Sequence, residues 1–491
     1  MIMKKHIIAG MLLATGLAQA GNPVEKPPVV SRPAVSSAER SKPNIILILA
    51  DDLGYGDLSC YDGVHFTPHL DRMAVEGLRF TDFHSTASVC SPTRASIMTG
   101  RYPHYDGLDT YISPVPGNTI GLDPENVTFP KLIKDVGYKT ALFGKWHLGY
   151  GQKYNPLNFG FETFHGFLSG HVDYHSHYDR LGGFDWWHGR EQKQEEGYTT
   201  HLITDKSVDF IKENADKPFF LMMAHEGVHF PLQGPTDPIQ RGPDAKPHKP
   251  RNGKLVYKDM LQELDISVGK IMDLVKELNL EKRTLIFFTS DNGPMPLSTA
   301  GPLRGKKHSA YEGGHRVPTI AWWPETIKAG SVTDQLAITM DLMPSILELA
   351  ETSVPEDHQL DSVSLVDFFK NQEPFDRNSL FWRRAGKYEI ELRRWPKEAD
   401  GTISGTLPDG SGTALPINQA MLFMSGHNHL KISEKKSYQF EGLTKRVNPK
   451  DKGVTFTMTL KKGPTALHTW FKGKDGIMLS AYYVYVNRKG L

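Results

Sequence analysis

Cys90 stands in the most chemically informative stretch of the chain, because it opens the spacing Cys-x-Pro-x-Arg with Pro92 and Arg94. Serine is a frequent helix cap and proline favours the first helical turn, so Ser91 and Pro92 predict a helix that starts beside residue 90. The amino end of a helix favours an anion, and Arg94 would lie one turn inside it. The pattern therefore predicts an anion-binding site around Cys90.

The other cysteine, Cys60, leaves a second interpretation of Cys90 open. An exported protein would permit a disulfide between these two cysteines. A cysteine held in a bridge is not available as a nucleophile, and a bridge leaves Pro92 and Arg94 unexplained. We therefore favour a reactive residue at position 90.

Two pairs of oxygen-bearing residues follow apolar runs: Asp51 and Asp52 follow an early run, and Asp291 and Asn292 follow a later one. Carboxylate and amide oxygens suit Ca²⁺ or Mg²⁺, and the lack of a Cys and His set among them argues against zinc. Helix capping or turn formation would explain one such pair, whereas its recurrence favours a metal. We expect calcium, because three carboxylates and an amide leave room for the oxygens of a substrate.

Basic and imidazole side chains follow two further apolar runs. Lys145 and His147 are two residues apart and would share one face of an extended segment, where the lysine binds an anion and the histidine accepts a proton. A buried histidine with a capping lysine is the alternative. His225 and His229 are candidates for a general acid, and the His-x-Pro arrangement favours His229. Lys307 lies in a basic loop that solvent exposure would also explain.

Four apolar runs of strand length precede these polar groups. Runs that are apolar throughout are typical of strands buried on both faces of a parallel sheet. The runs are 44–50, 140–144, 219–224 and 285–290. Ligands bind beyond the carboxyl ends of such strands, so the recurrence locates one site. With an amphipathic helix expected over 261–278, the sequence predicts an α/β fold with a large central, mostly parallel sheet flanked by helices.

The amino-terminal part of the chain differs from this central part. Residues 1–20 contain two lysines, an apolar stretch and Ala-Gln-Ala, which indicate a signal peptide and hence a periplasmic or secreted protein. A membrane anchor is the alternative, but the apolar stretch is shorter than the ~20 residues that cross a bilayer. Residues 21–42 are rich in Pro, Ser and Val, which indicates a linker.

Composition changes again near residue 375. We expect the α/β catalytic domain to span 43–375 and a smaller antiparallel β subdomain to span 376–491, because turn-rich sequence is followed there by short β-type runs. The expected strands are 430–433, 438–443, 454–460, 466–471 and 480–486.

The charge composition limits the classes of partner. The chain has 57 Lys and Arg against 56 Asp and Glu, so its net charge is close to zero. Neither nucleic acid nor, after signal removal, a membrane is therefore an expected partner. Attraction for an anion must be local.

Several separated blocks resemble the type I, formylglycine-dependent sulfatases of the alkaline phosphatase superfamily. They follow the family's order over most of residues 43–350 and comprise 51–57, the motif from Cys90 to Arg94, 144–147 and 291–293, with Lys307 at the position of a sulfate-binding lysine. In that family a formylglycine-generating maturation enzyme oxidises the cysteine to an aldehyde. The resemblance implies such a partner, one Ca²⁺ per chain and the hydrolysis of sulfate esters.

The resemblance also implies roles for individual residues. The catalytic set would be Cys90, Arg94, Lys145, His147, His229 and Lys307. The calcium ligands would be Asp51, Asp52, Cys90 after maturation, Asp291 and Asn292. The hydrated aldehyde would attack sulfur while the cations stabilise charge on the sulfuryl oxygens. His229 would protonate the departing alcohol, and His147 would take a proton to release sulfate.

The segment that begins at His171 is expected to contact the substrate. If it is extended, alternate residues over 171–177 share one face, and a second metal site is one interpretation. We prefer a polar and aromatic loop that lines a sugar pocket. The expected substrate contacts are His171, Asp173, His175, His177, Arg180, Trp186, Trp187 and His225. The loop resembles sulfatases that act on algal galactans such as carrageenan, so a sulfated polysaccharide or oligosaccharide is the expected substrate.

Two rival functions remain at this stage. A formylglycine-dependent phosphonate or phosphodiester hydrolase would use the same superfamily chemistry on phosphorus. A secreted carbohydrate-binding protein would never be matured and would keep Cys90 as a thiol or disulfide. The chemical state of residue 90 separates the second rival from an enzyme.

Overall fold

A computed structural model describes most of the chain from residue 42 onward. The residues described are 42–491 except 115–117, 247–248, 250, 378, 383–385, 396–398, 406, 410–413, 426–442, 461–465, 475–477, 481–482 and 490–491. The expected signal peptide (1–20) and nearly all of the expected linker (21–42) lie outside the described residues. Among the described residues, no helix combines the length and apolar character needed to span a membrane.

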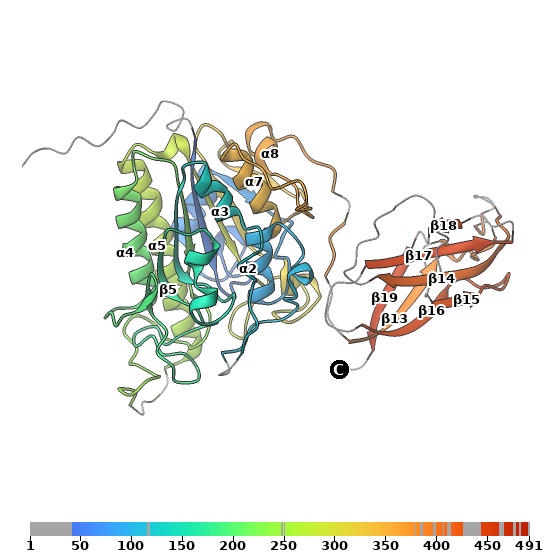
Figure 1. The fold of residues 1–491 in the computed structure, drawn as a ribbon, viewed down its shortest axis with the longest axis horizontal. Helices are drawn as coiled ribbons and strands as arrows, with labels where there is room; N and C mark the ends of the chain where they lie inside the picture. Colours follow the sequence, from blue (N-terminus) through green and yellow to red (C-terminus); the bar gives the residue numbers. More distant parts are fainter. Residues whose placement is uncertain are drawn as a thin grey trace, which may run out of the picture.

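One large sheet organises the amino-terminal part of the molecule (Figure 1). Its strands, in spatial order, are β11 (Ser331–Thr333), β2 (Leu78–Phe80), β10 (Thr319–Trp322), β9 (Thr284–Ser290), β1 (Asn44–Ala50), β8 (Phe219–Ala224), β4 (Lys139–Lys145), β5 (Thr163–Phe167), β6 (Trp187–His188) and β7 (Glu191–Gln192). The central strands from β9 to β5 are all parallel, whereas β10, β6 and β7 pair antiparallel with their neighbours. The expected α/β fold with a mostly parallel sheet is confirmed.

Helices cover both faces of this sheet. On one face the core includes side chains from α1 (Pro68–Glu76), α4 (Thr199–Glu213) and α5 (Gly253–Glu277). On the other it includes side chains from α2 (Cys90–Thr99), α3 (Phe129–Asp135), α7 (Leu342–Leu349) and α8 (Val366–Asn371). Alternate residues of β1 enter the two cores, with Ile46 and Ile48 in the first and Ile45 and Leu47 in the second, as period-two geometry requires. The strand is therefore apolar throughout.

Two helices begin earlier than the sequence predicts. Helix α5 starts at Gly253, where the Asn252 side chain accepts a hydrogen bond from the Lys254 backbone N–H, because apolar residues such as Val256 continue the buried stripe. Helix α2 starts at Cys90 itself, with Val89 at the cap position. The expected capping role of Ser91 is therefore wrong, since this residue already lies inside the first turn.

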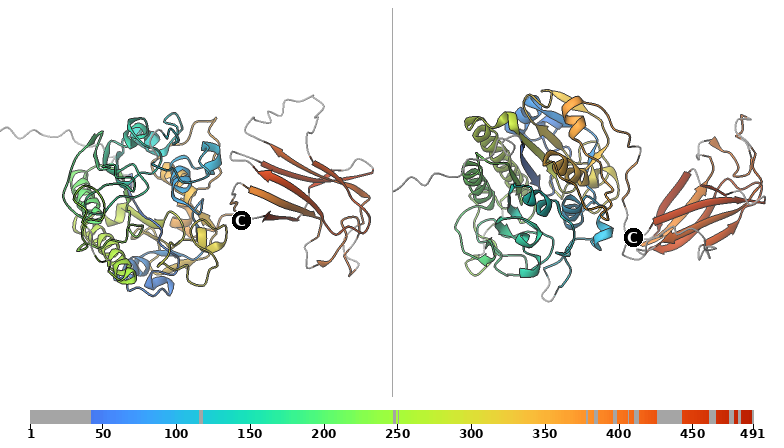
Figure 2. Two further views of the ribbon diagram at one scale, coloured as in Figure 1. Left: turned by 90° about the horizontal axis from the view of Figure 1, so that it is seen from below. Right: turned by 45° about the horizontal axis from the view of Figure 1, so that its top comes forward.

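The carboxy-terminal strands form two antiparallel sheets that stand beside the α/β part (Figures 1 and 2). One contains β16 (Val454–Leu460), β13 (Gly386–Arg393) and β19 (Tyr483–Lys489), and the other contains β15 (Leu443–Arg446), β14 (Ile417–Ser425), β17 (Ala466–Gly473) and β18 (Met478–Ser480). They have a core of their own, which includes Leu392, Ala420 and Phe456. The division at residue 375 stays a prediction.

The expected strands in this region fare differently from one another. The runs 454–460 and 466–471 are strands, whereas 480–486 is divided between β18 and β19. The run 430–433 and all of 438–443 except its last residue lie outside the described residues. β13 and β14 had no predicted counterpart.

Candidate active site

The two oxygen-bearing pairs meet at the carboxyl edge of the large sheet. β1 and β9 are adjacent and parallel in a register that pairs Ala50 with Ser290, so the residues that follow them are neighbours. The Asn292 Nδ2 donates to Asp52 Oδ1 at 2.6 Å, and the Asp52 backbone N–H lies 3.4 Å from Asp291 Oδ1. Asp51, Asp52, Asp291 and Asn292 are all fully buried. The strand ends therefore converge as the sequence predicted.

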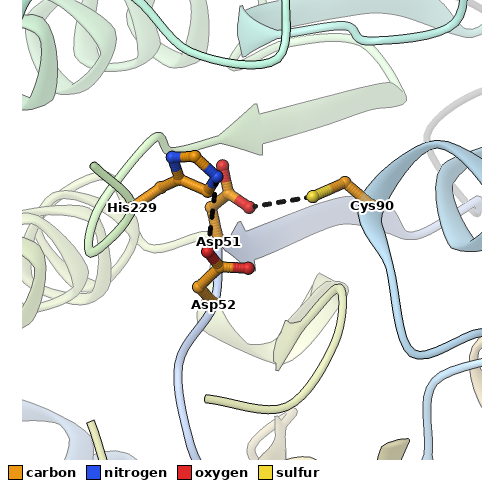
Figure 3. A group of neighbouring side chains, drawn as sticks. All are labelled: Asp51, Asp52, Cys90 and His229. Atoms are coloured by element: carbon orange, nitrogen blue, oxygen red, sulfur yellow. Dashed lines mark hydrogen bonds and ion pairs between the residues drawn. The ribbon is translucent and has the colours of Figure 1, made fainter. Parts of the chain in front are cut away.

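Cys90 faces this group from the amino end of α2 (Figure 3). Its Sγ lies 3.5 Å from Asp51 Oδ1 and 3.2 Å from Lys307 Nζ, and the residue is 1% exposed. Burial, with the negative charge of Asp291, raises the pKa of this thiol to about 12. Cys60 and Cys90 are both free, so the disulfide interpretation is wrong for this structure.

Three buried cations surround the carboxylates. Arg94 binds Asp291 through Nε at 3.0 Å and Nη2 at 2.9 Å. The Lys145 Nζ lies 2.5 Å from Asp51 Oδ2, and the Lys307 Nζ lies 2.6 Å from Asp52 Oδ1. Burial alone would raise the pKa of Asp52, but its interaction with Lys307, followed by those with His229 and Lys145, lowers it to about 2.

The oxygen donors fit a hard cation. Among the described residues, the buried Asn292 Oδ1 accepts no hydrogen bond, and neither does Asp52 Oδ2, although His229 Nε2 lies 3.3 Å from the latter. Asp51, Asp52, Cys90 and His229 each bring one potential ligand atom to within 4.8 Å of the others (Figure 3). Burying an oxygen atom without a hydrogen-bond donor costs free energy unless a bound cation interacts with it. These oxygen ligands therefore suit Ca²⁺.

His229 contacts the cluster through one ring nitrogen. Its Nδ1 lies 2.8 Å from the Phe230 carbonyl oxygen and must donate to it, which leaves Nε2 pointing to Asp52. Tyr174 fixes the backbone by donating from its hydroxyl to the His229 carbonyl at 3.0 Å. Burial lowers the pKa of His229 to about 3, although Asp52 acts in the opposite direction.

His147 approaches from the end of β4, but the segment is not extended as predicted. His147 has a left-handed backbone conformation with φ of 59°, so it does not share a face with Lys145 by strand alternation. Its Nε2 donates to the Ile112 carbonyl at 2.9 Å, which leaves a lone pair on the buried Nδ1. Burial, followed by the charge of Lys145, lowers the pKa of this imidazole well below its ordinary value.

His225 lies in the core between β8 and α5. Its Nε2 is 3.1 Å from Ser267 Oγ, and it is fully buried. Burial lowers its pKa to about 3. The side chain therefore packs against α5 and has no exposed surface for a substrate to contact, contrary to its expected role.

The segment after His171 is folded into turns, so the expectation of an extended strand with alternate residues on one face is wrong. Asp173 is buried and accepts hydrogen bonds from the backbone N–H groups of Ser176 and Arg241. His177 is buried with φ of 62°, and His175 Nε2 bonds the Gly234 carbonyl at 3.2 Å. Within the described part of the chain, these side chains do not form a metal-binding group.

The two tryptophans of this segment belong to the interior. Trp186 is 1% exposed, its ring stacks on His177 with centroids 4.4 Å apart, and its Nε1 donates to Glu195 at 2.9 Å. Trp187 is 8% exposed and donates to Asp185. Neither ring presents a face to a sugar as predicted, because the hydrophobic core covers both. Arg180, in contrast, is exposed.

Two supporting groups escaped the sequence reasoning. Asp57 is buried and accepts hydrogen bonds from the Gly54 and Thr299 backbone N–H groups and from the Tyr257 hydroxyl, so it fixes the turn that carries Asp51 and Asp52. Its place in the block 51–57 was the available signal. Ile112 binds His147 through its carbonyl, and its N–H donates to Ser91 Oγ at 3.0 Å. No local pattern marks this second role.

The fold and this cluster define a sulfatase. A family model described as Sulfatase matches residues 43–352, so the chain belongs to the sulfatase family, as its resemblance indicated, and is a sulfuric ester hydrolase.

Individual relatives are similar over most of their length. N-acetylgalactosamine-6-sulfatase of Canis lupus familiaris is 33% identical over 386 residues, which is 72% of this chain and 72% of that protein. Arylsulfatase A of Homo sapiens is 34% identical over 384 residues, with coverage of 71% and 72%. The crystal structure of Ps i-CgsB in complex with k-i-k-neocarrahexaose has a TM-score of 0.62 at 32% identity and covers 68% of this chain and 77% of that chain.

Proposed function

We propose that this chain is an exported carbohydrate sulfatase that uses one Ca²⁺ and a formylglycine made from Cys90. One observation carries the proposal: buried carboxylates at the ends of β1 and β9 meet Cys90 at the amino end of α2, with buried cations beside them. When present, the hydrated aldehyde supplies the nucleophile and the ion neutralises charge on the sulfuryl oxygens. Asp51, Asp52, Asp291, Asn292 and residue 90 would hold the ion.

The charge of the cluster supports an anionic substrate. Asp51, Asp52 and Asp291 are offset by Arg94, Lys145 and Lys307, so three carboxylates face three cations. A divalent ion added to this neutral set gives an excess of two positive charges in a buried site. Preorganised positive charge of this kind binds the sulfate group and stabilises the charge that develops on its oxygens.

Two histidines are placed to move protons. His229 Nε2 is the only ring nitrogen of that residue not committed to a backbone carbonyl, so it is assigned the proton that goes to the leaving alcohol. The sulfate of the substrate favours the protonated ring, because a nearby anion stabilises an imidazolium. His147 Nδ1 carries a lone pair and is assigned the acceptance of a proton from residue 90.

The burial of Cys90 bears on its maturation. With 1% of its surface exposed and a thiol pKa of about 12, Cys90 in the folded chain is neither accessible nor ionised. A maturation enzyme therefore has to oxidise residue 90 before α2 packs against the sheet. Residues 1–20 are proposed to direct export to the periplasm or beyond it.

A sulfated carbohydrate is the proposed substrate. Among the relatives, one is named for N-acetylgalactosamine 6-sulfate, and Ps i-CgsB was crystallised with a carrageenan-type hexaose. The half-buried His171, whose ring packs on that of His229, and the exposed Arg180 suit the hydroxyl and anionic groups of such a substrate. Individual sugars are distinguished by the experiment below.

The test combines mass spectrometry with turnover. The full chain is produced with and without a formylglycine-generating enzyme, and the tryptic peptide 80–94, which contains Cys90, is weighed. Only protein with the mass loss of thiol-to-aldehyde conversion should release sulfate from N-acetylgalactosamine 6-sulfate or from carrageenan disaccharides. Cys90→Ala should abolish release, whereas the matched variant Cys60→Ala should retain it.

Two outcomes contradict the proposal. Faster turnover of a phosphonate or phosphodiester than of every sulfate ester would favour the rival hydrolase. An unmodified residue 90 in protein that nonetheless releases sulfate would remove the formylglycine from the mechanism.

A further inference from the structure

Two guanidinium groups beside the site have no carboxylate partner. Arg241 and Arg180 each make one side-chain hydrogen bond, to His171 and to Ser113 respectively, and neither forms an ion pair with any described residue. This differs from Arg94, whose guanidinium is held by Asp291. A guanidinium has five N–H donors, so most donors of these two groups are uncommitted.

Arg241 sets the state of the imidazole next to the proposed acid. Its Nη1 lies 2.9 Å from His171 Nδ1, and because arginine only donates, His171 must accept at Nδ1 and carry its proton on Nε2. The His171 ring packs on the His229 ring with centroids 4.9 Å apart and planes inclined by 30°. Arg241 is therefore separated from His229 by a single side chain.

Arg180 is held by the segment that contains Ile112 and Ser113. Its Nη2 donates to Ser113 Oγ at 2.7 Å. Ser113 follows Ile112, whose N–H donates to Ser91 and whose carbonyl accepts from His147. The backbone that holds Arg180 is thus anchored to the residue after Cys90. His229, Arg241, Lys145 and Arg180 all act electrostatically on the His171 ring.

The nearest carboxylates are committed to turns. Asp173 accepts backbone hydrogen bonds from His175 and Ser176 at Oδ1 and from Gln240 and Arg241 at Oδ2. Asp179 Oδ1 accepts from the backbone N–H groups of Leu181 and Gly183. Glu226 is fully buried, its Oε1 accepts a hydrogen bond from the Val172 backbone N–H at 2.7 Å, and its burial raises its pKa well above the ordinary value. These three carboxyl groups act on Arg241 electrostatically, but no described carboxylate forms an ion pair with either arginine.

We propose that Arg241 and Arg180, together with the Nε2–H of His171, form a subsite for a second anionic group on the sugar that carries the cleaved sulfate or on its neighbour. This rests on the proposed function and sharpens its substrate class to a saccharide with two negative groups. Planar guanidinium groups bind sulfate and carboxylate in the same bidentate manner, so a second sulfate and a uronic acid carboxylate share the required chemistry.

The test uses matched pairs of disaccharides. A κ-type neocarrabiose sulfate and its ι-type counterpart differ by one added sulfate. N-acetylgalactosamine 6-sulfate linked to glucuronic acid differs from the same compound linked to glucose only in having a carboxylate in place of a hydroxymethyl group. Binding to the full chain with Cys90→Ser is measured by calorimetry, and turnover is measured with matured protein. We expect the doubly anionic member of at least one pair to bind about tenfold more tightly or better, as charged hydrogen bonds allow.

Arginine variants identify the subsite. Arg241→Gln and Arg180→Gln should each bring the affinity ratio of that pair toward one, by about tenfold for Arg241. Arg72→Gln is the matched control, because Arg72 pairs with Asp273 where α1 packs on α5. The pair in which the doubly anionic member binds more tightly shows whether the subsite binds a sulfate or a carboxylate.

Equal binding of both members in every pair, or a ratio that neither arginine variant changes, would overturn the subsite. The binding readout needs no catalysis, so a protein that binds the doubly anionic sugar selectively but turns over no sulfate ester refutes the proposed function and leaves the subsite standing.

Discussion

Two regions of the molecule are held in place by different kinds of interaction. They are the strand-end cluster (Asp51, Asp52, Asp291 and Asn292) and the segment 169–188. Each member of the cluster is the first or second residue after a strand, and the parallel register of β1 with β9 brings the members together. In the segment 169–188 only Trp187 and His188, which form β6, belong to the large sheet, and buried carboxylates such as Asp173 and Asp185 fix the preceding turns by accepting backbone hydrogen bonds. Strand geometry therefore orders the strand-end cluster, while side-chain anchors order the segment 169–188.

The first prediction tests the segment 169–188 through Trp186, its largest fully buried side chain. Trp186→Ala should lower the free energy of unfolding by about 3–5 kcal/mol, because a 1% exposed indole is replaced by a cavity. Leu181→Ala, in the same segment but 53% exposed, should change it by less than about 0.5 kcal/mol. Urea denaturation of both variants measures the difference. A small loss for Trp186→Ala would mean that the indole is not part of the core.

The same two regions differ in how well their structure could be predicted from the sequence. The apolar runs 44–50 and 285–290 form adjacent parallel strands. Their length and continuous apolar character predict two buried parallel strands, so Asp51 and Asp291, which follow them, are expected at the same edge of the sheet. The turns after His171 could not be predicted, because Asp173 takes backbone partners as distant as Arg241. The same holds for the left-handed backbone of His147, which no local sequence pattern marks.

The second prediction tests the catalytic side with two adjacent lysines. Lys307→Met should lower kcat/KM about a hundredfold or more, because its Nζ lies 3.2 Å from Cys90 Sγ and a preorganised cation is lost where charge develops. Lys306→Met should stay within about twofold, because that residue is exposed. Turnover of matured protein gives both values. Equal losses would instead indicate a general effect on the loop.

The third prediction separates the two regions by their response to calcium. Chelation should abolish turnover and lower Tm by about 5 °C, because an ion bound only by the folded state stabilises it by about 2 kcal/mol or more at saturating concentration. Asp51→Asn should remove this thermal response. Asp173→Asn should be less stable than the parent protein yet keep the response, since Asp173 orders turns. Loss of the thermal response in Asp173→Asn would mean that the ion binds near Asp173 and not at the strand-end cluster.

The last and smallest prediction concerns the acid stability of the segment 169–188. Glu195 binds Trp186 Nε1 and His188 Nε2, both at 2.9 Å, and Lys206 Nζ at 3.1 Å. Burial alone would raise the pKa of Glu195, but the hydrogen bonds from Trp186 and Lys206 lower it from 4.5 to about 2. Because the folded-state pKa is the lower one, the stabilisation is complete above pH 4.5 and is lost as the pH falls toward 2.

The variant Glu195→Gln isolates this contribution. The side chain is 20% exposed and solvent screens its charge, so the wild type should exceed the variant by only about 1 kcal/mol at pH 7. The difference should shrink as the pH falls below 4.5, since protonated glutamate and glutamine then behave alike. Thermal unfolding of both proteins at pH 7, 4 and 3 measures it. A difference that is constant with pH would show that shape, and not the charge of Glu195, anchors Trp186.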